Sequence, residues 1–222
     1  MDAVGHHAGP GVVIGFNLAG VRSVVALGAH PDDIEIAAGG LLLSLPAGVT
    51  VDYVLATGAP TRQAEARAAA SAFLSQAAAL NFHLHALPDG RLPAHWNETK
   101  EIVEAAASLG VPDLVLAPAT DDAHQDHRLL ATLASTAFRN SLVLHYEIPK
   151  WDGDLGRRNI YVPLTPDQGR RKVALLHEHF PSQKARDWWD DEVFLGLARI
   201  RGMECRSHYA EAYTVTKAVL TF

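Results

Sequence analysis

The stretch that decides the fold is Val24-Val25-Ala26-Leu27-Gly28-Ala29-His30-Pro31-Asp32-Asp33. Its apolar first half is typical of a buried strand, and its second half places an imidazole and two carboxylates at the turn that follows. The proline pushes His30 toward extended geometry, so we expect His30 at the end of a strand rather than inside a helix. Active-site groups of open α/β sheets collect at that end. The stretch therefore predicts a functional site at the carboxyl end of a strand.

The rest of the chain alternates apolar, strand-like runs with helical patterns. This alternation predicts an α/β fold: a Rossmann-like, doubly wound, mostly parallel sheet with helices on both faces, in a single domain. We expect strands at 21–27, 51–56, 82–87, 114–117, 142–146, 159–164 and 213–220. Helices are expected at 36–45, 61–80, 98–109 with Asn97 as its cap, 129–139, 166–179 and 191–201. Residues 1–10 are expected to form a loose tail, and 11–222 the domain.

The composition of the chain limits the kinds of binding partner and the cellular location that we expect. The chain has 222 residues, 48% of them hydrophobic, and a formal net charge of -6, which argues against nucleic acid and suits a small-molecule substrate. The single cysteine, Cys205, excludes an internal disulfide and fits a reducing compartment, so we expect a cytoplasmic protein. The apolar run 12–16 is too short to cross a bilayer, so no stable membrane insertion is expected. A homo-oligomer is compatible with the sequence, which does not determine oligomeric state.

A second polar stretch, Thr120-Asp121-Asp122-Ala123-His124-Gln125-Asp126-His127, follows the predicted strand at 114–117. Because the carboxyl ends of parallel strands face one edge of a sheet, the two stretches can meet over one crevice. Each stretch alone has a simpler interpretation, a helix N-cap with a surface histidine beside it. Two such clusters, each directly after a strand, favour a shared site. Within the second, Asp121 and Asp122 could line the pocket, but the favoured interpretation is that they are turn residues before a helix.

The residue types fit a divalent-metal site with a general base. A catalytic zinc ion takes three protein ligands and keeps one position open for water. His30 and Asp33 can chelate one ion, and one histidine of the second stretch would complete the set. Asp32 then lies beside the metal as a base. His124, if it is not a ligand, can stabilise an oxyanion or donate a proton, and Asp126 can orient a neighbouring imidazole.

These residues resemble the PIG-L / LmbE-like family of zinc-dependent N-deacetylases, which remove acetyl groups from N-acetylglucosaminyl and related amino-sugar compounds. The resemblance rests on Ala29-His30-Pro31-Asp32-Asp33 and His124-Gln125-Asp126-His127, and it covers roughly residues 21–145. Two further elements look like motifs of the family: Arg62 with Glu65 as Arg-x-x-Glu, and the turn Pro88-Asp89-Gly90-Arg91-Leu92.

The resemblance implies a role for each residue. His30, Asp33 and His127 would bind Zn2+, although other divalent metals would also fit. Asp32 would be the general base, and His124 the electrophile or acid with Asp126 behind it. Arg62 would contact a substrate phosphate or hydroxyl, unless it only pairs with Glu65. The chain departs from the family where Ile34 precedes Glu35, and where Gln125 stands in place of a common proline.

The resemblance thus predicts a metal-dependent amidohydrolase that removes an N-acetyl group from an amino-sugar conjugate and releases acetate and a free amine. Two other functions stay open. A carboxylate-rich site could hold two metals and cleave a phosphoester. A sugar- or nucleotide-binding module could have kept the fold without catalysis, although Asp32 argues against it because a binding module needs no base.

Overall fold

The structure is a computed structural model that describes residue 15 and residues 17–219. The predicted tail at 1–10 lies outside the described residues. None of the helices in the described part of the chain is long and apolar enough to cross a membrane.

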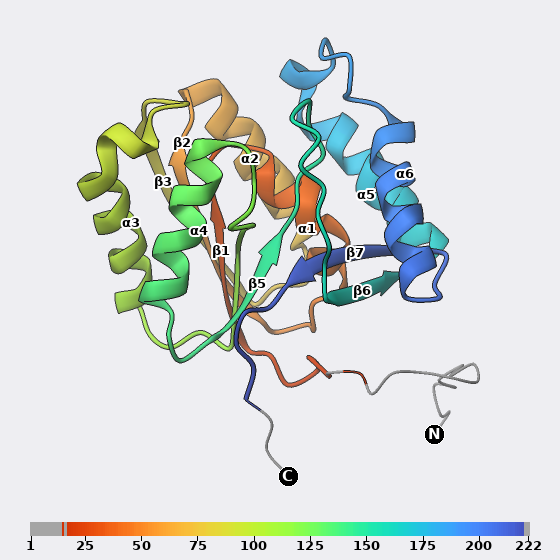
Figure 1. The fold of residues 1–222 in the computed structure, drawn as a ribbon, viewed down its shortest axis with the longest axis horizontal. Helices are drawn as coiled ribbons and strands as arrows, with labels where there is room; N and C mark the ends of the chain where they lie inside the picture. Colours follow the sequence, from red (N-terminus) through yellow and green to blue (C-terminus); the bar gives the residue numbers. More distant parts are fainter. Residues whose placement is uncertain (1–14, 16, 220–222) are drawn as a thin grey trace.

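A seven-stranded sheet forms the centre of the fold, in the order β3-β2-β1-β4-β5-β7-β6 (Figure 1). The first five strands are parallel, and β7 runs antiparallel to both of its neighbours. The strands are β1 (Ser23–Gly28), β2 (Thr50–Thr57), β3 (Ala79–Leu87), β4 (Leu114–Pro118), β5 (Leu142–Tyr146), β6 (Ile160–Leu164) and β7 (Tyr209–Thr214). The predicted mostly parallel α/β fold is confirmed.

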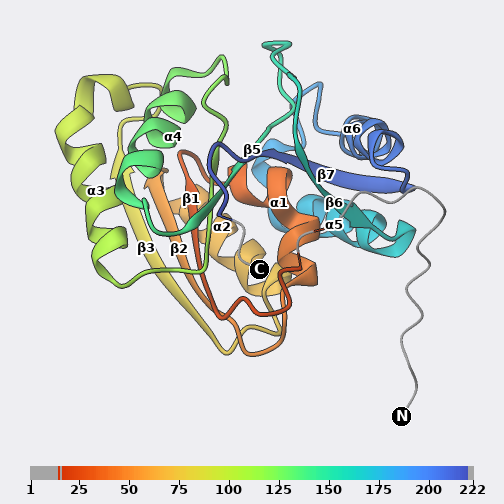
Figure 2. The same cartoon turned by 60° about the horizontal axis from the view of Figure 1, so that its bottom comes forward.

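Helices cover both faces of this sheet, as Figures 1 and 2 show. The α-helices are α1 (Asp33–Ser44), α2 (Pro60–Phe73), α3 (Trp96–Ser108), α4 (Gln125–Ala137), α5 (Pro166–His179) and α6 (Asp191–Glu204), with short 3-10 helices η1 (Leu92–His95) and η2 (Pro181–Gln183). Two apolar cores result. One packs α1, α2, α5 and α6 against the sheet, and the other packs α3 and α4 against the opposite face.

Several element boundaries differ from the sequence prediction: α1 begins at Asp33 rather than 36, β3 begins at Ala79 rather than 82, and α6 ends at Glu204 rather than 201. Other differences have tertiary reasons. The Ala-rich helix α2 ends at Phe73 instead of 80, because Ala79 already pairs with Thr50 in the sheet. Helix α3 begins at Trp96, since η1 leads directly into it, so Asn97 lies inside its first turn and is not the cap. Strand β7 covers Tyr209–Thr214 rather than 213–220, because residues 209–213 pair with β6.

A further difference moves functional residues of the second cluster into a helix. Helix α4 begins at Gln125, four residues before the predicted start at 129. Its first turn is polar, so apolar periodicity revealed the helix only from Leu129 onward. Asp126 and His127 therefore lie in the first turn of α4, and His124 is its N-cap.

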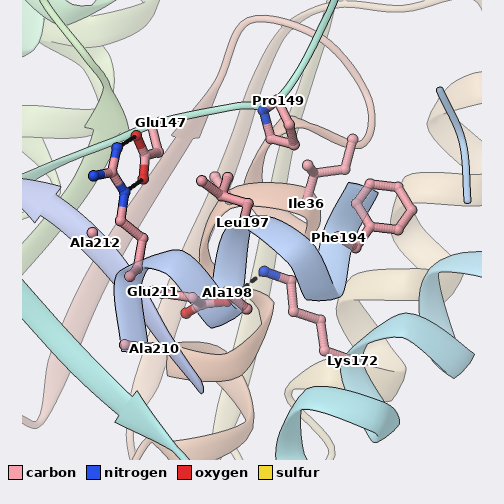
Figure 3. A pocket seen from close by; sticks show the side chains of 12 residues that line it. Ile36, Glu147, Pro149, Lys172, Phe194, Leu197, Ala198, Ala210, Glu211 and Ala212 are labelled. Atoms are coloured by element: carbon pink, nitrogen blue, oxygen red, sulfur yellow. Dashed lines mark hydrogen bonds and ion pairs between the residues drawn. The ribbon is translucent and has the colours of Figure 1, made fainter. Parts of the chain in front are cut away.

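The carboxyl-terminal elements enclose buried charge (Figure 3). Lys172 Nζ donates to Glu211 Oε1 at 2.6 Å, and Arg201 Nη2 donates to Glu147 Oε2 at 2.7 Å. These pairs line a cavity of about 20 Å3, room for about one water, between α1, α6 and β7. No residue of the two sequence clusters lines it, so this cavity is separate from the candidate site.

Candidate active site

The two polar clusters lie side by side because β1 and β4 are neighbours in the sheet, with Val24 paired to Leu114. Both clusters follow the carboxyl ends of these strands. The rings of His30 and His124 have centroids 4.8 Å apart, and those of His124 and His127 are 4.7 Å apart. The structure thus brings together residues almost a hundred positions apart in the chain.

Three atoms of this cluster form a near-equilateral triangle. His30 Nδ1 lies 3.1 Å from His127 Nε2 and 3.5 Å from Asp33 Oδ2, and the last two atoms are 3.3 Å apart. A tetrahedral zinc ion with bonds of 2.0–2.2 Å separates its ligand atoms by about 3.3 Å. The donor set and its spacing therefore fit a zinc ion held by three protein ligands.

Electrostatics in this triangle also fit a cation. Burial lowers the pKa of His127, but Asp33 and Asp122 outweigh burial and raise that pKa to about 9. Burial raises the pKa of Asp33, but the two imidazoles hold it well below its usual range. In the metal-free protein, protons on the imidazoles thus balance the negative charge of the carboxylates. A metal ion that binds here must displace those protons.

Asp32 occupies a strained position beside the triangle. Its backbone has φ 112°, in the left-handed region that residues other than glycine rarely adopt. Although it is the N-cap of α1, its side chain caps no backbone N–H. Burial raises the pKa of Asp32 to about 7, even though the nearby Arg62 guanidinium lowers it. Asp32 is thus a buried carboxyl group that titrates near neutral pH.

Arg62 fixes the direction of this carboxylate. Its Nη2 donates to Asp32 Oδ2 at 2.6 Å and also to the carbonyl of Pro31. Its Nη1 donates to Glu65 Oε2 at 2.5 Å and to Ser182 Oγ at 2.9 Å. Both terminal nitrogens of the guanidinium thus donate to protein groups, and a contact with substrate stays a prediction.

His124 carries its proton on the nitrogen that faces away from α4. Its Nδ1 accepts a hydrogen bond from the Asp126 N–H at 3.3 Å, so in the neutral ring Nε2 bears the hydrogen. Burial and the charges of His127 and His30 lower the pKa of His124, which favours this neutral form. His124 therefore offers an N–H donor in the cluster.

Asp126 lies behind His30 rather than behind His124. Its Oδ2 is 3.2 Å from His30 Nε2 and accepts from the Gly90 N–H at 2.8 Å, while Oδ1 accepts from the Leu92 N–H at 3.0 Å. A proton on His30 Nε2 leaves Nδ1 free to bind a metal. A second carboxylate oxygen, from Asp89, lies 3.1 Å from His30 Nε2. Asp89 belongs to the turn whose Gly90 N–H donates to Asp126.

Asp122 lies in the turn before α4, as predicted, and its carboxylate also belongs to the cluster. It is buried, its Oδ2 lies 3.0 Å from His127 Nδ1, and its Oδ1 lies 3.0 Å from Lys150 Nζ. His127 Nδ1 makes no regular hydrogen bond, but at 3.0 Å we regard Asp122 as its partner. Spacing alone could not separate Asp122 from the exposed Asp121, and nothing in the sequence pointed to Lys150.

A comparison with known protein families now places these residues. The family described as GlcNAc-PI de-N-acetylase (PIG-L) matches residues 25–138, just over half of the chain. The chain belongs to the PIG-L family. The resemblance seen in the sequence is thereby confirmed, and the match includes both polar clusters and Arg62, but not Lys150 or Ser182. No curated protein sequence matches the chain.

Solved structures share the PIG-L chain's fold at low identity. An N,N'-diacetylchitobiose deacetylase from Pyrococcus horikoshii is 21% identical with a TM-score of 0.68, covering 88% of this chain and 84% of its own. The zinc-inhibited form of the teicoplanin deacetylase Orf2 is 16% identical with a TM-score of 0.66, covering 90% and 100%. The 4-carboxy-2-hydroxymuconate hydratase GalB from Pseudomonas putida KT2440 is 16% identical with a TM-score of 0.69, covering 90% and 98%. Because a hydratase shares the fold, the fold alone does not choose the reaction.

Two further residues of this PIG-L member explain its local sequence. Glu35, the acidic residue that Ile34 separates from the Asp pair, is fully buried and accepts a hydrogen bond from Tyr53 Oη at 2.9 Å. Burial raises the pKa of Glu35 to about 8 despite that hydrogen bond. Gly58 has φ 130°, and a Cβ there would lie 2.6 Å from Pro31 Cγ. Gly58 thus leaves the space that the turn at Pro31 occupies.

Proposed function

We propose that this chain is a zinc-dependent hydrolase that removes an N-acetyl group from an N-acetylglucosaminyl or related amino-sugar conjugate. The observation that carries the proposal is the triangle of His30, Asp33 and His127, with atoms 3.1–3.5 Å apart, next to the strained and buried Asp32. Membership in the PIG-L family and a likeness to two deacetylases of the same fold support it.

In this proposal His30, Asp33 and His127 hold the zinc ion. When bound, such an ion acts as a Lewis acid and lowers the pKa of water to about 7. Asp126 supports the set by orienting His30 through the 3.2 Å contact to Nε2. Zinc is the metal that the His2Asp donor set and the triangle spacing favour, and another divalent metal could load the same residues.

Asp32 is the general base of the proposed reaction. It accepts a proton from water as the water oxygen adds to the acetyl carbonyl. Burial supports this role, because it raises the pKa of the carboxyl group in the metal-free protein and so makes the carboxylate a stronger base. Arg62 keeps the carboxylate aimed by donating to Oδ2, and the unusual backbone of Asp32 keeps its side chain out of the helix cap.

His124 stabilises the oxyanion through its Nε2–H, the donor that its Nδ1 contact leaves free. The carbon–nitrogen bond then breaks, and the amine leaves with a proton supplied by Asp32 or His124. The products are acetate and a free amino sugar. Each atom of the added water is thereby accounted for, with its oxygen in acetate and its protons on acetate or the amine.

The test is acetate release from a panel of N-acetyl amino-sugar conjugates: monosaccharides, nucleotide sugars, glycolipids and antibiotic glycosides. Zinc-loaded protein is expected to release acetate from at least one class, and chelator-treated protein is expected to release none. Zinc-loaded protein that releases no acetate from any class would refute the proposal and favour a binding module. Two tightly bound ions per chain would favour a phosphoesterase instead.

The compartment also belongs to this proposal. We infer that the protein works in the cytoplasm on a small-molecule substrate, because its single cysteine and net charge of -6 fit a reducing compartment and a partner other than nucleic acid. Fractionation of cells that express a tagged full-length chain checks this, and recovery in the membrane fraction would contradict it.

A further inference from the structure

The carboxylate of Asp122 links three parts of the molecule. Its Oδ2 lies 3.0 Å from His127 Nδ1, the ring nitrogen opposite the proposed metal-binding Nε2. Its Oδ1 accepts from the His124 N–H at 2.7 Å and lies 3.0 Å from Lys150 Nζ. The Asp122 side chain is only 3% exposed, so these protein groups are its surroundings.

Lys150 comes from outside the part of the chain that the family matches. It follows β5 in the segment 147–159, and its ammonium group lies between Asp122 Oδ1 and Asp154 Oδ2, the latter at 2.5 Å. Asp154 Oδ2 also accepts from the Ala123 N–H at 2.6 Å. The segment after β5 therefore holds both the side chain of Asp122 and the backbone next to it.

We propose that Asp122 is a positioning residue that selects the metal-binding tautomer of His127, and that Lys150 holds Asp122 in place for that task. The inference rests on the proposed zinc site. A carboxylate only accepts hydrogen bonds, so Asp122 Oδ2 keeps the proton of neutral His127 on Nδ1. Nε2 is then free to bind a metal on the triangle side.

The isosteric change Asp122→Asn tests the tautomer directly. Its amide oxygen can replace Oδ1, where Lys150 and the His124 N–H both donate, and the amide NH2 then faces His127 Nδ1. That NH2 group is a donor, so it favours the ring form with the proton on Nε2, which cannot bind a metal. The volume of the side chain hardly changes.

The experiment measures zinc affinity by competition with a chromogenic chelator, in full-length wild-type protein and variants first freed of metal. Asp122→Asn is expected to weaken zinc binding about 10–100-fold. Asp121→Asn is the matched control, because Asp121 is the neighbouring aspartate, pairs with Arg158 and is 56% exposed. We expect its zinc affinity to equal that of wild type. Cobalt-loaded Asp122→Asn should also show a changed visible spectrum, a readout that a loss of stability alone would not move.

Lys150→Met tests the second half of the proposal and serves if Asp122→Asn does not fold. It is expected to weaken zinc binding less than Asp122→Asn, and to add no further loss in the double variant, because Lys150 acts through Asp122. Unchanged zinc affinity in Asp122→Asn, or in Lys150→Met if Asp122→Asn does not fold, would overturn the inference. Additive losses in the double variant would overturn the role of Lys150.

These outcomes separate this inference from the proposed function. Wild-type protein without measurable zinc affinity would overturn both. Wild-type protein that binds zinc tightly, with Asp122→Asn equally tight, would overturn the role of Asp122 alone and leave deacetylation standing.

Discussion

The turn after β1 and the turn after β4 meet at one site but are built in opposite ways. In the first turn, Asp32 has a left-handed backbone and its side chain caps nothing in α1. In the second turn, His124 has an ordinary extended backbone, with φ -75°, and caps α4 through its ring nitrogen. The first turn is strained, whereas the second is regular and supported from behind by Asp122 and Lys150.

This contrast suggests a division of labour. Strain of about 1–3 kcal/mol persists where function requires it, and here it keeps a carboxylate free for proton transfer. The regular turn gains rigidity, which suits residues that must hold a metal ion and a donor in fixed directions. Both turns supply a metal ligand, but only the first supplies a base.

The largest expected effect tests whether the metal needs both turns. His30→Ala and His127→Ala, one from each turn, are expected to lose tightly bound zinc and with it all acetate release, because each removes one of three ligands. His124→Ala should keep its zinc and lose most of its activity. Metal content after dialysis checks this, and full zinc in either ligand variant would break the comparison.

The next effect isolates the base. Asp32→Asn is expected to keep near-normal zinc but to lower kcat about 10^2–10^4-fold, because the amide cannot accept the proton from water. Metal content and initial rates of acetate release, measured on one sample, check both halves. If the variant loses zinc along with activity, then Asp32 belongs to the metal set and the division within the first turn is wrong.

Glu35 provides a pH test of the first turn in metal-free protein. Its pKa rises from the ordinary value of 4.5 to about 8 on burial, so the folded state holds a proton that the unfolded state releases. This contribution to stability is complete below about pH 4.5 and is lost as pH rises toward 8, by up to about 1.4 kcal/mol per pH unit. The Glu35→Gln variant should not show this pH-dependent loss of stability, because glutamine does not titrate. Chemical denaturation of both proteins at pH 5 and pH 7.5 measures the difference.

Glu104→Gln on the exposed face of α3 is the control for that test, because Glu104 is exposed and pairs with Lys100 at the surface. Its stability relative to wild type should not change between the two pH values. A constant difference between wild type and Glu35→Gln would show that the acid is not held protonated in the folded state.

The smallest effect concerns the strain itself. Asp32→Gly and Asp32→Ala both remove the carboxylate, but only glycine adopts φ 112° without cost. The glycine variant is expected to be more stable than the alanine variant by about 1 kcal/mol, or about 2–4 °C in Tm for a chain of this size. Thermal unfolding checks this. Equal stability would mean that the turn relaxes when the side chain is lost.

Sequence patterns predicted the parallel part of the fold well because its strands are short, continuous apolar runs such as Leu114–Pro118. They failed where pairing or capping overrides local propensity. The Ala-rich α2 ends early because the segment after it pairs in the sheet as β3. The first turn of α4 is polar and therefore shows no helical spacing of apolar residues. Helix α5, with its Thr165 capping box and proline, begins and ends as predicted.

The candidate site was predictable to the extent that its residues directly follow strands. His30, Asp33 and His127 needed only parallel topology to meet. Asp122 and Lys150 could not be assigned, because their partners lie on other elements and burial is a property of the folded chain. Arg62 was identified through the family motif, but its contact with Asp32 could not be predicted, because it joins residues 30 positions apart.

Gly58 shows how far the site's requirements extend beyond its chemistry. It has no side chain to bind a metal or move a proton, yet a methyl group on its Cα would collide with Pro31 and disturb the turn that carries His30 and Asp32. In a library of random variants, position 58 should therefore tolerate as few substitutions as a metal ligand. Intolerance to mutation would then identify a position that takes no part in the chemistry. A catalyst redesigned on this scaffold would have to retain that glycine even if its reacting groups were replaced.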